Sequence, residues 1–178
     1  METIFYGVCG EGLGHAIRAI SIIERLEGCK VYVFTFGKAH DFFEEMEYPY
    51  LKEIKGVKFS RSSGGISQIG SIMTAAKHFM GKSHKQNVQM VHDLAQFLKP
   101  SLFITDFEPT MPVVANKMDK WVYSIDSQHR FYHGDMSDLP TRWLRWYAWG
   151  AGHFTKWFIK NPSRIIISTF HRPEYKHR

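Results

Sequence analysis

The sequence is poor in cysteine and has no long hydrophobic run. Its two cysteines, Cys9 and Cys29, lack CxxC spacing, so they indicate reduced thiols in a cytoplasmic protein and argue against a secreted disulfide framework. No apolar stretch reaches the ~20 residues of a membrane-spanning helix, and the first residues do not resemble a signal peptide. Internal repeats and low-complexity segments are also missing, and 178 residues are about one domain's length.

Acidic residues are scarce in only one part of the chain. Residues 142–178 contain eight Lys or Arg but a single acid, whereas residues 1–141 contain 15 Lys or Arg and 16 acids. Four of the five tryptophans fall within residues 142–160. This distribution predicts a nearly neutral domain with one cationic, aromatic patch. It argues against a nucleic-acid binder with a uniformly basic face.

Strand and helix patterns alternate along the chain. An apolar run at 3–8, a glycine-rich loop, helical spacing at 16–26 and a β-branched, aromatic run at 30–36 form a βαβ unit, which is typical of a parallel sheet. Similar patterns predict helices at 39–46, 67–98 (interrupted near Gly81) and 112–118, strands at 50–54, 57–60, 102–105 and 121–125, and a loop at 62–65. The predicted fold class is α/β: a Rossmann-like, open, mostly parallel sheet with helices on both faces.

Polar residues follow three of these predicted strands. They are the loop from Gly10 to His15, Asp106 with Glu108, and Asp126 with His129. Ligands of open parallel sheets bind outside the carboxyl ends of the strands. We therefore expect these residues to line one edge, with His15 within roughly 10 Å, a few hydrogen-bond lengths, of Asp106 or Glu108.

The glycine loop favours a polar or anionic ligand. Gly10, Gly12 and Gly14 permit a sharp turn and expose N–H groups at the start of a helix. The loop does not end in the Lys-Ser/Thr of a Walker loop, and His15 replaces the third glycine of a dinucleotide loop. A dinucleotide site has an acid after the second strand, but here Lys38 takes that place. This weakens the case for a phosphorylated nicotinamide cofactor without excluding one. The alternative is that the glycines serve tight packing alone.

His15 and the acids could perform proton transfer. Histidine suits removal of a proton from a hydroxyl near neutral pH, and a helix N-terminus disfavours its charged form. In extended backbone Asp106 and Glu108 point the same way, so one could orient a partner while the other accepts a proton. In the alternative interpretation, these residues cap helices, pack or are solvated, and His129 is an ordinary loop histidine.

Residues 10–18 (GEGLGHAIR) resemble the opening of GT-B glycosyltransferases, in particular the bacterial and archaeal branch with a GxGxGHxxR start. Residues 105–109 (TDFEP) and 124–129 (SIDSQH) resemble two further segments of that family, in the same order. The resemblance implies inverting transfer of a sugar from a nucleotide-diphosphate sugar, with no resident cofactor. His15 would be the base, with Asp106 or Glu108 orienting or replacing it. The implied substrate contacts are Gly12, Gly14, Arg18, Asp126 and His129.

GT-B enzymes have two Rossmann-like domains, the first mainly for the acceptor and the second for the nucleotide-sugar. The resemblance therefore implies that residues 1–160 form the acceptor-side domain and that residues 161–178 begin the crossover to a second domain. On this interpretation the chain is an incomplete, inactive half. His129 and His133 share helical spacing but lack a third ligand, and GT-B enzymes do not depend on a metal, so we predict none.

The segment 142–160 interleaves tryptophan with basic residues. Trp143, Trp146 and Trp149 recur every three residues. Tryptophan and cationic side chains suit a membrane interface, so the segment predicts contact with the inner face of the cell membrane and a saccharide or lipid-linked cell-envelope acceptor. Core packing, or a face for the second domain, is the stronger alternative, because an aromatic stripe at helical spacing is most often core, and stacking on single-stranded nucleic acid is the least favoured.

Two other functions remain open at this point. One is a non-hydrolysing nucleotide-sugar epimerase of the GT-B type, which would need no acceptor. The other is a non-enzymatic nucleotide- or nucleic-acid-binding module, which would bind single strands in a salt-dependent way.

Overall fold

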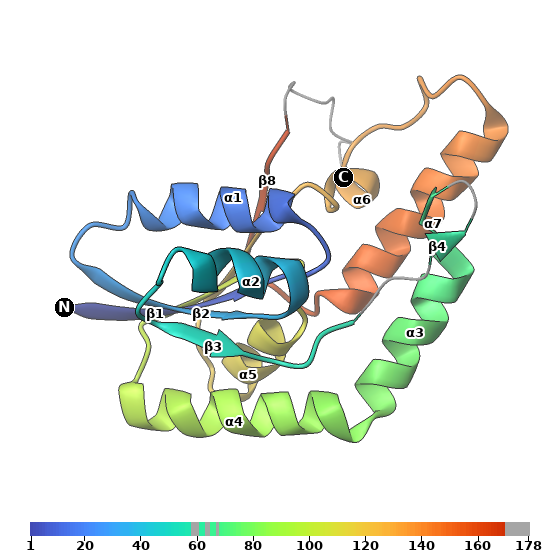
Figure 1. Cartoon of the computed structure of the whole chain (residues 1–178). Coiled ribbons are helices and arrows are strands. Elements are labelled where there is room, and N and C mark those ends of the chain that lie inside the picture. Colours follow the sequence, from blue (N-terminus) through green and yellow to red (C-terminus); the bar gives the residue numbers. More distant parts are fainter. Residues whose placement is uncertain (58–60, 63–64, 67, 170–178) are drawn as a thin grey trace.

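The computed structural model describes residues 1–57, 61–62, 65–66 and 68–169. Its centre is a six-stranded, parallel sheet in the order β3-β2-β1-β6-β7-β8 (Figure 1). The strands are β1 (Glu2–Val8), β2 (Cys29–Thr35), β3 (Leu51–Glu53), β6 (Leu102–Asp106), β7 (Val122–Asp126) and β8 (Arg164–Ile167). The chain builds outward from β1 in one direction and then from β6 in the other. The carboxyl ends of β1 and β6 therefore form the switch point where such sheets bind ligands.

Helices cover both faces of this sheet. Those of the described residues are α1 (Leu13–Ile23), α2 (Gly37–Glu45), α3 (Gln68–Met80), α4 (Lys82–Leu98), α5 (Thr110–Lys117), α6 (Arg130–His133) and α7 (Arg142–Phe158). Figure 1 shows α1 and α2 on one face and α4 and α5 on the other, while α3 runs away from the sheet to meet α7. This arrangement confirms the Rossmann-like α/β fold with helices on both faces.

Two apolar layers hold the helices on the sheet. Under α1 and α2, the small side chains of Ala16 and Ala19 let α1 lie close to Tyr6 and Ile104. On the opposite face, α4, α5 and the end of α7 pack on a cluster that contains Phe5, Phe34 and Phe103. Burial of such rings is the main favourable term in folding.

Several predicted boundaries need correction. Helix α1 begins at Leu13 and ends at Ile23, because Arg25 and Leu26 bond back only three residues and tighten the chain into turns. Val57 lies in no strand, and the rest of the strand predicted at 57–60 lies outside the described residues. The predicted loop at 62–65 contains the ends of a short antiparallel pair, β4 (Arg61–Ser62) and β5 (Gly65–Ile66), and residues 63–64 lie outside the described residues.

The last strand of the sheet was not predicted from the sequence. Residues 164–167, expected within a crossover segment, form β8 and pair with β7 from Tyr123–Arg164 to Asp126–Ile167. The sheet therefore extends past residue 160, the boundary expected for the domain. Local sequence did not show this, because an apolar run such as IIIS fits an edge strand and a linker equally well.

Gly10 is required by the close approach of two loops at the switch point. A Cβ at Gly10 would lie 1.9 Å from the carbonyl oxygen of Phe36. We expect Gly10→Ala to lower the unfolding free energy by roughly 1–3 kcal/mol, as overpacking does, measured by thermal or urea unfolding. Gly14→Ala is the matched control, because a Cβ there meets nothing within 4 Å and alanine favours a helix. Equal melting temperatures for the two variants would contradict this role of Gly10.

Candidate functional site

His15, Arg18 and Asp106 meet at the carboxyl ends of β1 and β6. His15 and Arg18 lie one turn apart on α1, and Asp106 is the last residue of β6. His15 Nδ1 lies 2.7 Å from Asp106 Oδ1. Arg18 donates from Nε to Oδ2 and from Nη2 to Oδ1 of the same carboxylate, both at 2.7 Å. The expected proximity of His15 to Asp106 is confirmed.

The contacts of Asp106 determine which nitrogen of His15 carries its proton. A carboxylate only accepts hydrogen bonds, so its 2.7 Å contact requires the proton on Nδ1. Arg18 Nη2, 3.1 Å from that nitrogen, is then a neighbour and not a donor to it. In this tautomer Nε2 carries the lone pair, which is the form that accepts a proton from a hydroxyl.

Asp106 is held rigidly. Its side chain is completely buried, whereas His15 is 16% exposed. Burial lowers the pKa of Arg18, but its hydrogen bonds and charge interaction with Asp106 outweigh that effect and raise the pKa overall, with Asp126 adding a smaller contribution. The result is a buried carboxylate clamped by a guanidinium fork, with the imidazole at the boundary with solvent.

Glu108 is not part of this cluster. Phe107 has a φ of +54°, so the backbone after β6 is not extended, and the expectation that Asp106 and Glu108 point the same way is wrong. Glu108 instead accepts from the backbone N–H groups of Thr110 and Met111 at the start of α5. The ring of Phe107 stacks beside His15, with centroids 6.5 Å apart and planes 13° apart.

Glu108 fits beneath β1 because Gly7 has no side chain. A Cβ on Gly7 would lie 2.6 Å from Glu108 Oε2 and 2.5 Å from Met111 Cγ. Burial raises the pKa of Glu108 from 4.5 to about 7, although the hydrogen bonds at the start of α5 oppose the shift. The residue therefore serves as a buried helix cap, the alternative noted for an acid after a strand.

The glycine loop divides into two parts. Gly10 packs against the backbone of Phe36, but Cβ atoms at Gly12 and Gly14 would meet nothing within 4 Å. Gly12 is the N-cap of α1. Because glycine has no side chain, the backbone N–H groups in the first turn of α1 have no N-cap side chain to which they can donate a hydrogen bond. Open space beside such a turn suits an anionic or polar ligand.

Asp126 and His129 form a second pair at the end of β7. Asp126 accepts from His129 Nδ1 at 2.7 Å, from His129 N at 2.9 Å and from Ser124 Oγ at 2.7 Å. Burial would raise the pKa of Asp126, but these hydrogen bonds outweigh it and lower the pKa. His129 is buried and stacks on His133 of α6, with centroids 6.1 Å apart, so the pair orients α6.

The sequence did not single out Tyr6. Its side chain is fully buried in β1, and its hydroxyl has no hydrogen-bond partner among the described residues. Burial raises its pKa, and Asp106 raises it further. A tyrosine within the apolar part of β1 (residues 4–8) was the available signal, because a buried hydroxyl normally has a partner.

The tryptophan segment is a helix with an exposed aromatic side. In α7, Trp143, Trp146 and Trp149 are 67%, 75% and 56% exposed, so the alternative that these rings pack in the core is wrong. The buried face holds Ala148, Gly152, Thr155 and Phe158 instead. None of the helices in the part of the chain that the structure describes is long and apolar enough to cross a membrane.

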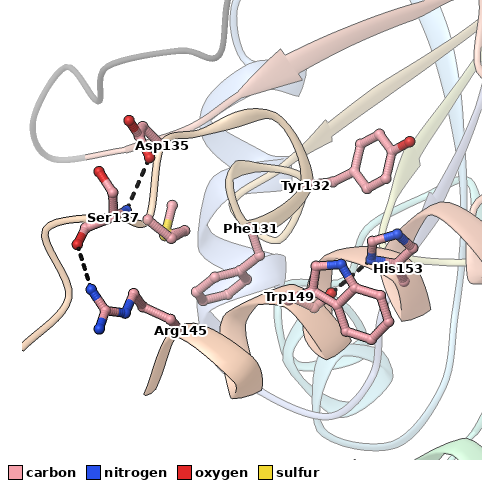
Figure 2. Close-up of a pocket in the computed structure, with 8 residues that line it drawn as sticks. Phe131, Tyr132, Asp135, Ser137, Arg145, Trp149 and His153 are labelled. Atoms are coloured by element: carbon pink, nitrogen blue, oxygen red, sulfur yellow. Dashed lines mark hydrogen bonds between the residues drawn. The ribbon is translucent and has the colours of Figure 1, made fainter. Parts of the chain in front are cut away.

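A pocket lies between α6 and α7. It has a volume of about 500 Å³ and is bordered by Tyr132, Asp135, Arg145, Trp149 and His153 among others. Figure 2 shows Arg145 donating to the Ser137 carbonyl in the loop after α6, and Trp149 lying against His153. No group of three or more His, Cys, Asp or Glu in the described residues could hold a metal ion, and the metal-independence of the reaction stays a prediction.

Two solved structures show the fold of the chain. One is Arabidopsis thaliana UGT89C1 complexed with UDP-L-rhamnose (TM-score 0.58, 11% identity, 94% of this chain and 45% of that one). The other is spinosyn rhamnosyltransferase SpnG complexed with spinosyn aglycone (TM-score 0.53, 13% identity, 94% and 44%). The fold is that of the N-terminal domain of a GT-B glycosyltransferase, and the chain spans less than half the length of these proteins.

Sequence comparison then gives the family. Residues 2–178 match the model of glycosyl transferase family 1, and the chain belongs to that family. No curated protein matches the sequence.

The buried position of Glu108 makes stability depend on pH. Below pH 4.5 the carboxyl is protonated in both folded and unfolded chains; between 4.5 and about 7 mainly the unfolded chain loses the proton. The unfolding free energy should therefore fall across this window, by roughly 3 kcal/mol, and not change further above it. We expect Glu108→Gln to reduce this fall in urea unfolding at a series of pH values. The control is Glu45→Gln, an exposed residue of α2, and a Glu108→Gln profile that matches it would refute the assignment.

Proposed function

We propose that this chain is the acceptor-side domain of an inverting, metal-independent glycosyltransferase that uses a nucleotide-diphosphate sugar. The observation that carries the proposal is the His15–Asp106 pair at the switch point of the sheet, with Nδ1 bonded to the carboxylate at 2.7 Å. Family membership supports sugar transfer as the reaction, as does the GxGxGHxxR start of the bacterial and archaeal branch.

The proposed chemistry follows from the tautomer of His15. Nε2 takes the proton from an acceptor hydroxyl as that oxygen attacks the anomeric carbon of the donor. The bond from this carbon to the diphosphate oxygen breaks, and the diphosphate leaves with the electron pair. Attack from the face opposite the leaving group inverts the configuration at the anomeric carbon. Asp106 stabilises the imidazolium, and Arg18 keeps both carboxylate oxygens in position.

The donor is proposed to lie over the glycine loop. Space next to Gly12 and Gly14, at the start of α1, suits the charged part of a nucleotide-sugar. UGT89C1 was solved with UDP-L-rhamnose and SpnG with thymidine diphosphate (TM-score 0.52), which supports a donor of this class. Because the chain spans less than half of these proteins, we propose that most donor contacts come from a second domain and that these 178 residues alone do not turn over.

An epimerase is the second candidate, because it would act on a similar nucleotide-sugar. The family match favours a transferase. Product analysis separates the two: a transferase yields a glycosylated acceptor and a free nucleotide, whereas an epimerase changes the sugar without an acceptor. A nucleic-acid-binding module is not favoured, since His15 and Asp106 would have no role in it.

Substitution of the pair tests the mechanism in an enzyme that carries this chain as its acceptor-side domain. His15→Ala should lower kcat by ~10²–10⁴, the scale of a lost general base. Asp106→Asn should also lower kcat, and the double variant should lose little more than His15→Ala alone, because the two residues act as a unit. His92→Ala, a partly exposed histidine on α4, is the matched control. Unchanged kcat in His15→Ala would refute the role of His15 as base.

We also propose that α7 brings the domain to an anionic membrane, consistent with a cell-envelope acceptor. Its exposed tryptophans lie on a helix that contains Arg142, Arg145 and Lys156 but no acid. Tryptophan rings add apolar area at the interface, and each basic residue near the surface contributes ~1 kcal/mol.

Vesicle binding tests this contact. Binding should rise with the content of anionic lipid and weaken with salt. Trp143→Ser should lower it at an unchanged melting temperature, because this ring is 67% exposed. Trp121→Ser, an exposed tryptophan outside α7, is the control. Equal affinity for neutral and anionic vesicles would contradict the electrostatic part of the proposal.

A further inference from the structure

We infer that the pocket between α6 and α7 is a subsite for an acidic saccharide, one sugar ring of which carries a phosphate or carboxylate. The inference rests on the proposed function, in which this domain binds the acceptor. It adds the chemical class of that acceptor and the residues that recognise it.

The shape of the surface is the first observation. The α6–α7 pocket, with a volume of about 500 Å³, is of the size that holds a small ligand. A second hollow of about 400 Å³ is bordered by Arg142, Arg145, Trp146 and Trp149. Because Arg145 and Trp149 border both, the two hollows adjoin along α7.

The pocket has the chemistry of a sugar site. The Trp149 ring is 56% exposed and lies 4.3 Å, centroid to centroid, from the ring of His153. His153 Nδ1 donates to the Trp149 carbonyl at 2.9 Å, which fixes the imidazole beside the indole (Figure 2). A flat, supported indole face suits the C–H face of a pyranose. The carboxylate of Asp135 and the guanidinium of Arg145 border the same pocket and suit hydroxyl groups.

The adjoining hollow supplies the preference for an anion. It is bordered by two arginines and no acid. Arg145 is anchored, since it donates from Nη1 to the Ser137 carbonyl at 3.2 Å. In the pocket itself, the one acid of the border, Asp135, accepts from the backbone of Ser137 at 2.9 Å and so orders the loop. Paired guanidinium groups favour a phosphate or carboxylate group over a neutral hydroxyl.

The position of the pocket connects it to the proposed catalytic pair. α6 follows the carboxyl end of β7, and α1, which carries His15, follows the carboxyl end of β1, so the pocket beside α6 lies at the same edge of the sheet as His15. α7 is fixed at this edge through Phe107, whose ring meets Phe158 at 5.0 Å and Phe154 at 6.5 Å and stacks beside His15. On this inference, an acceptor of more than one unit held in the pocket extends toward His15.

Titration of the full chain with defined probes tests the subsite without turnover. Glucose 1-phosphate, glucose and inorganic phosphate are titrated separately by calorimetry. We expect glucose 1-phosphate to bind more tightly than either single component. Arg145→Gln and Trp149→Leu should each weaken it at least about tenfold, Trp149→Phe should retain most of the affinity, and Trp143→Leu, on the same helix but outside both hollows, should have no effect.

Three results would overturn the inference. Inorganic phosphate as tight as glucose 1-phosphate would leave only an anion site. Loss of affinity in Trp143→Leu equal to that in Trp149→Leu would indicate a general effect of the aromatic face. Binding restricted to anionic vesicles, with none to glucose 1-phosphate at millimolar concentration, would leave a membrane surface only. Melting temperatures equal to wild type confirm that each variant is folded.

Failure of the subsite and failure of the proposed function give different results. His15→Ala reports on the mechanism through turnover, whereas Arg145→Gln reports on the subsite through binding of glucose 1-phosphate. If His15→Ala retains full turnover while Arg145→Gln still weakens binding, the mechanism is wrong and the subsite stands. The reverse outcome refutes the subsite alone.

Discussion

A completely buried carboxylate is the constraint on which the site depends. An ionised acid without solvent is costly unless charged and polar partners surround it, and Asp106 obtains them from one turn of α1. This requirement fixes the position of α1 against β6, because both oxygens of Asp106 accept from Arg18 and one also accepts from His15. The same contacts set the tautomer of the imidazole. The packing of α1 against β6 therefore also determines which nitrogen of His15 carries the proton.

Much of this arrangement could be predicted from sequence because it depends on strand ends. In a parallel sheet every carboxyl end lies at one edge, so a polar residue after each of three strands was enough to bring His15 and Asp106 together. The positions of Gly12 and Gly14 beside open space also agree with the ligand-binding interpretation of the loop. The family of the chain was accessible in the same way, from residues 10–18 and the order of two later segments.

The errors arose where a single backbone angle or a long-range partner decides the outcome. Because Asp106 and Glu108 are two residues apart, we expected their side chains to lie side by side. The positive φ of Phe107 instead turns Glu108 toward the start of α5. Exposure of Trp143 and Trp146 could not be predicted from their period of three, because the same period fits a buried stripe. Which face of α7 is buried depends on tertiary contacts, such as the close approach of Gly152 to α6 and the burial of Phe158. Residues 164–167 formed a strand because β7 offered an edge, which is a property of the sheet and not of the segment.

The glycines of the loop have unequal surroundings, so different constraints act on Gly10 and on the pair Gly12 and Gly14. A larger side chain at Gly10 disturbs the chain itself, whereas at Gly12 or Gly14 it enters open space, which is where we propose that the ligand binds. A lineage that abandoned its ligand would thus be free to lose the second and third glycines, and would keep the first for as long as it kept this fold. Within the five residues 10–14, substitutions at one position would therefore reflect the packing of the domain, and substitutions at two others would reflect the binding of a ligand.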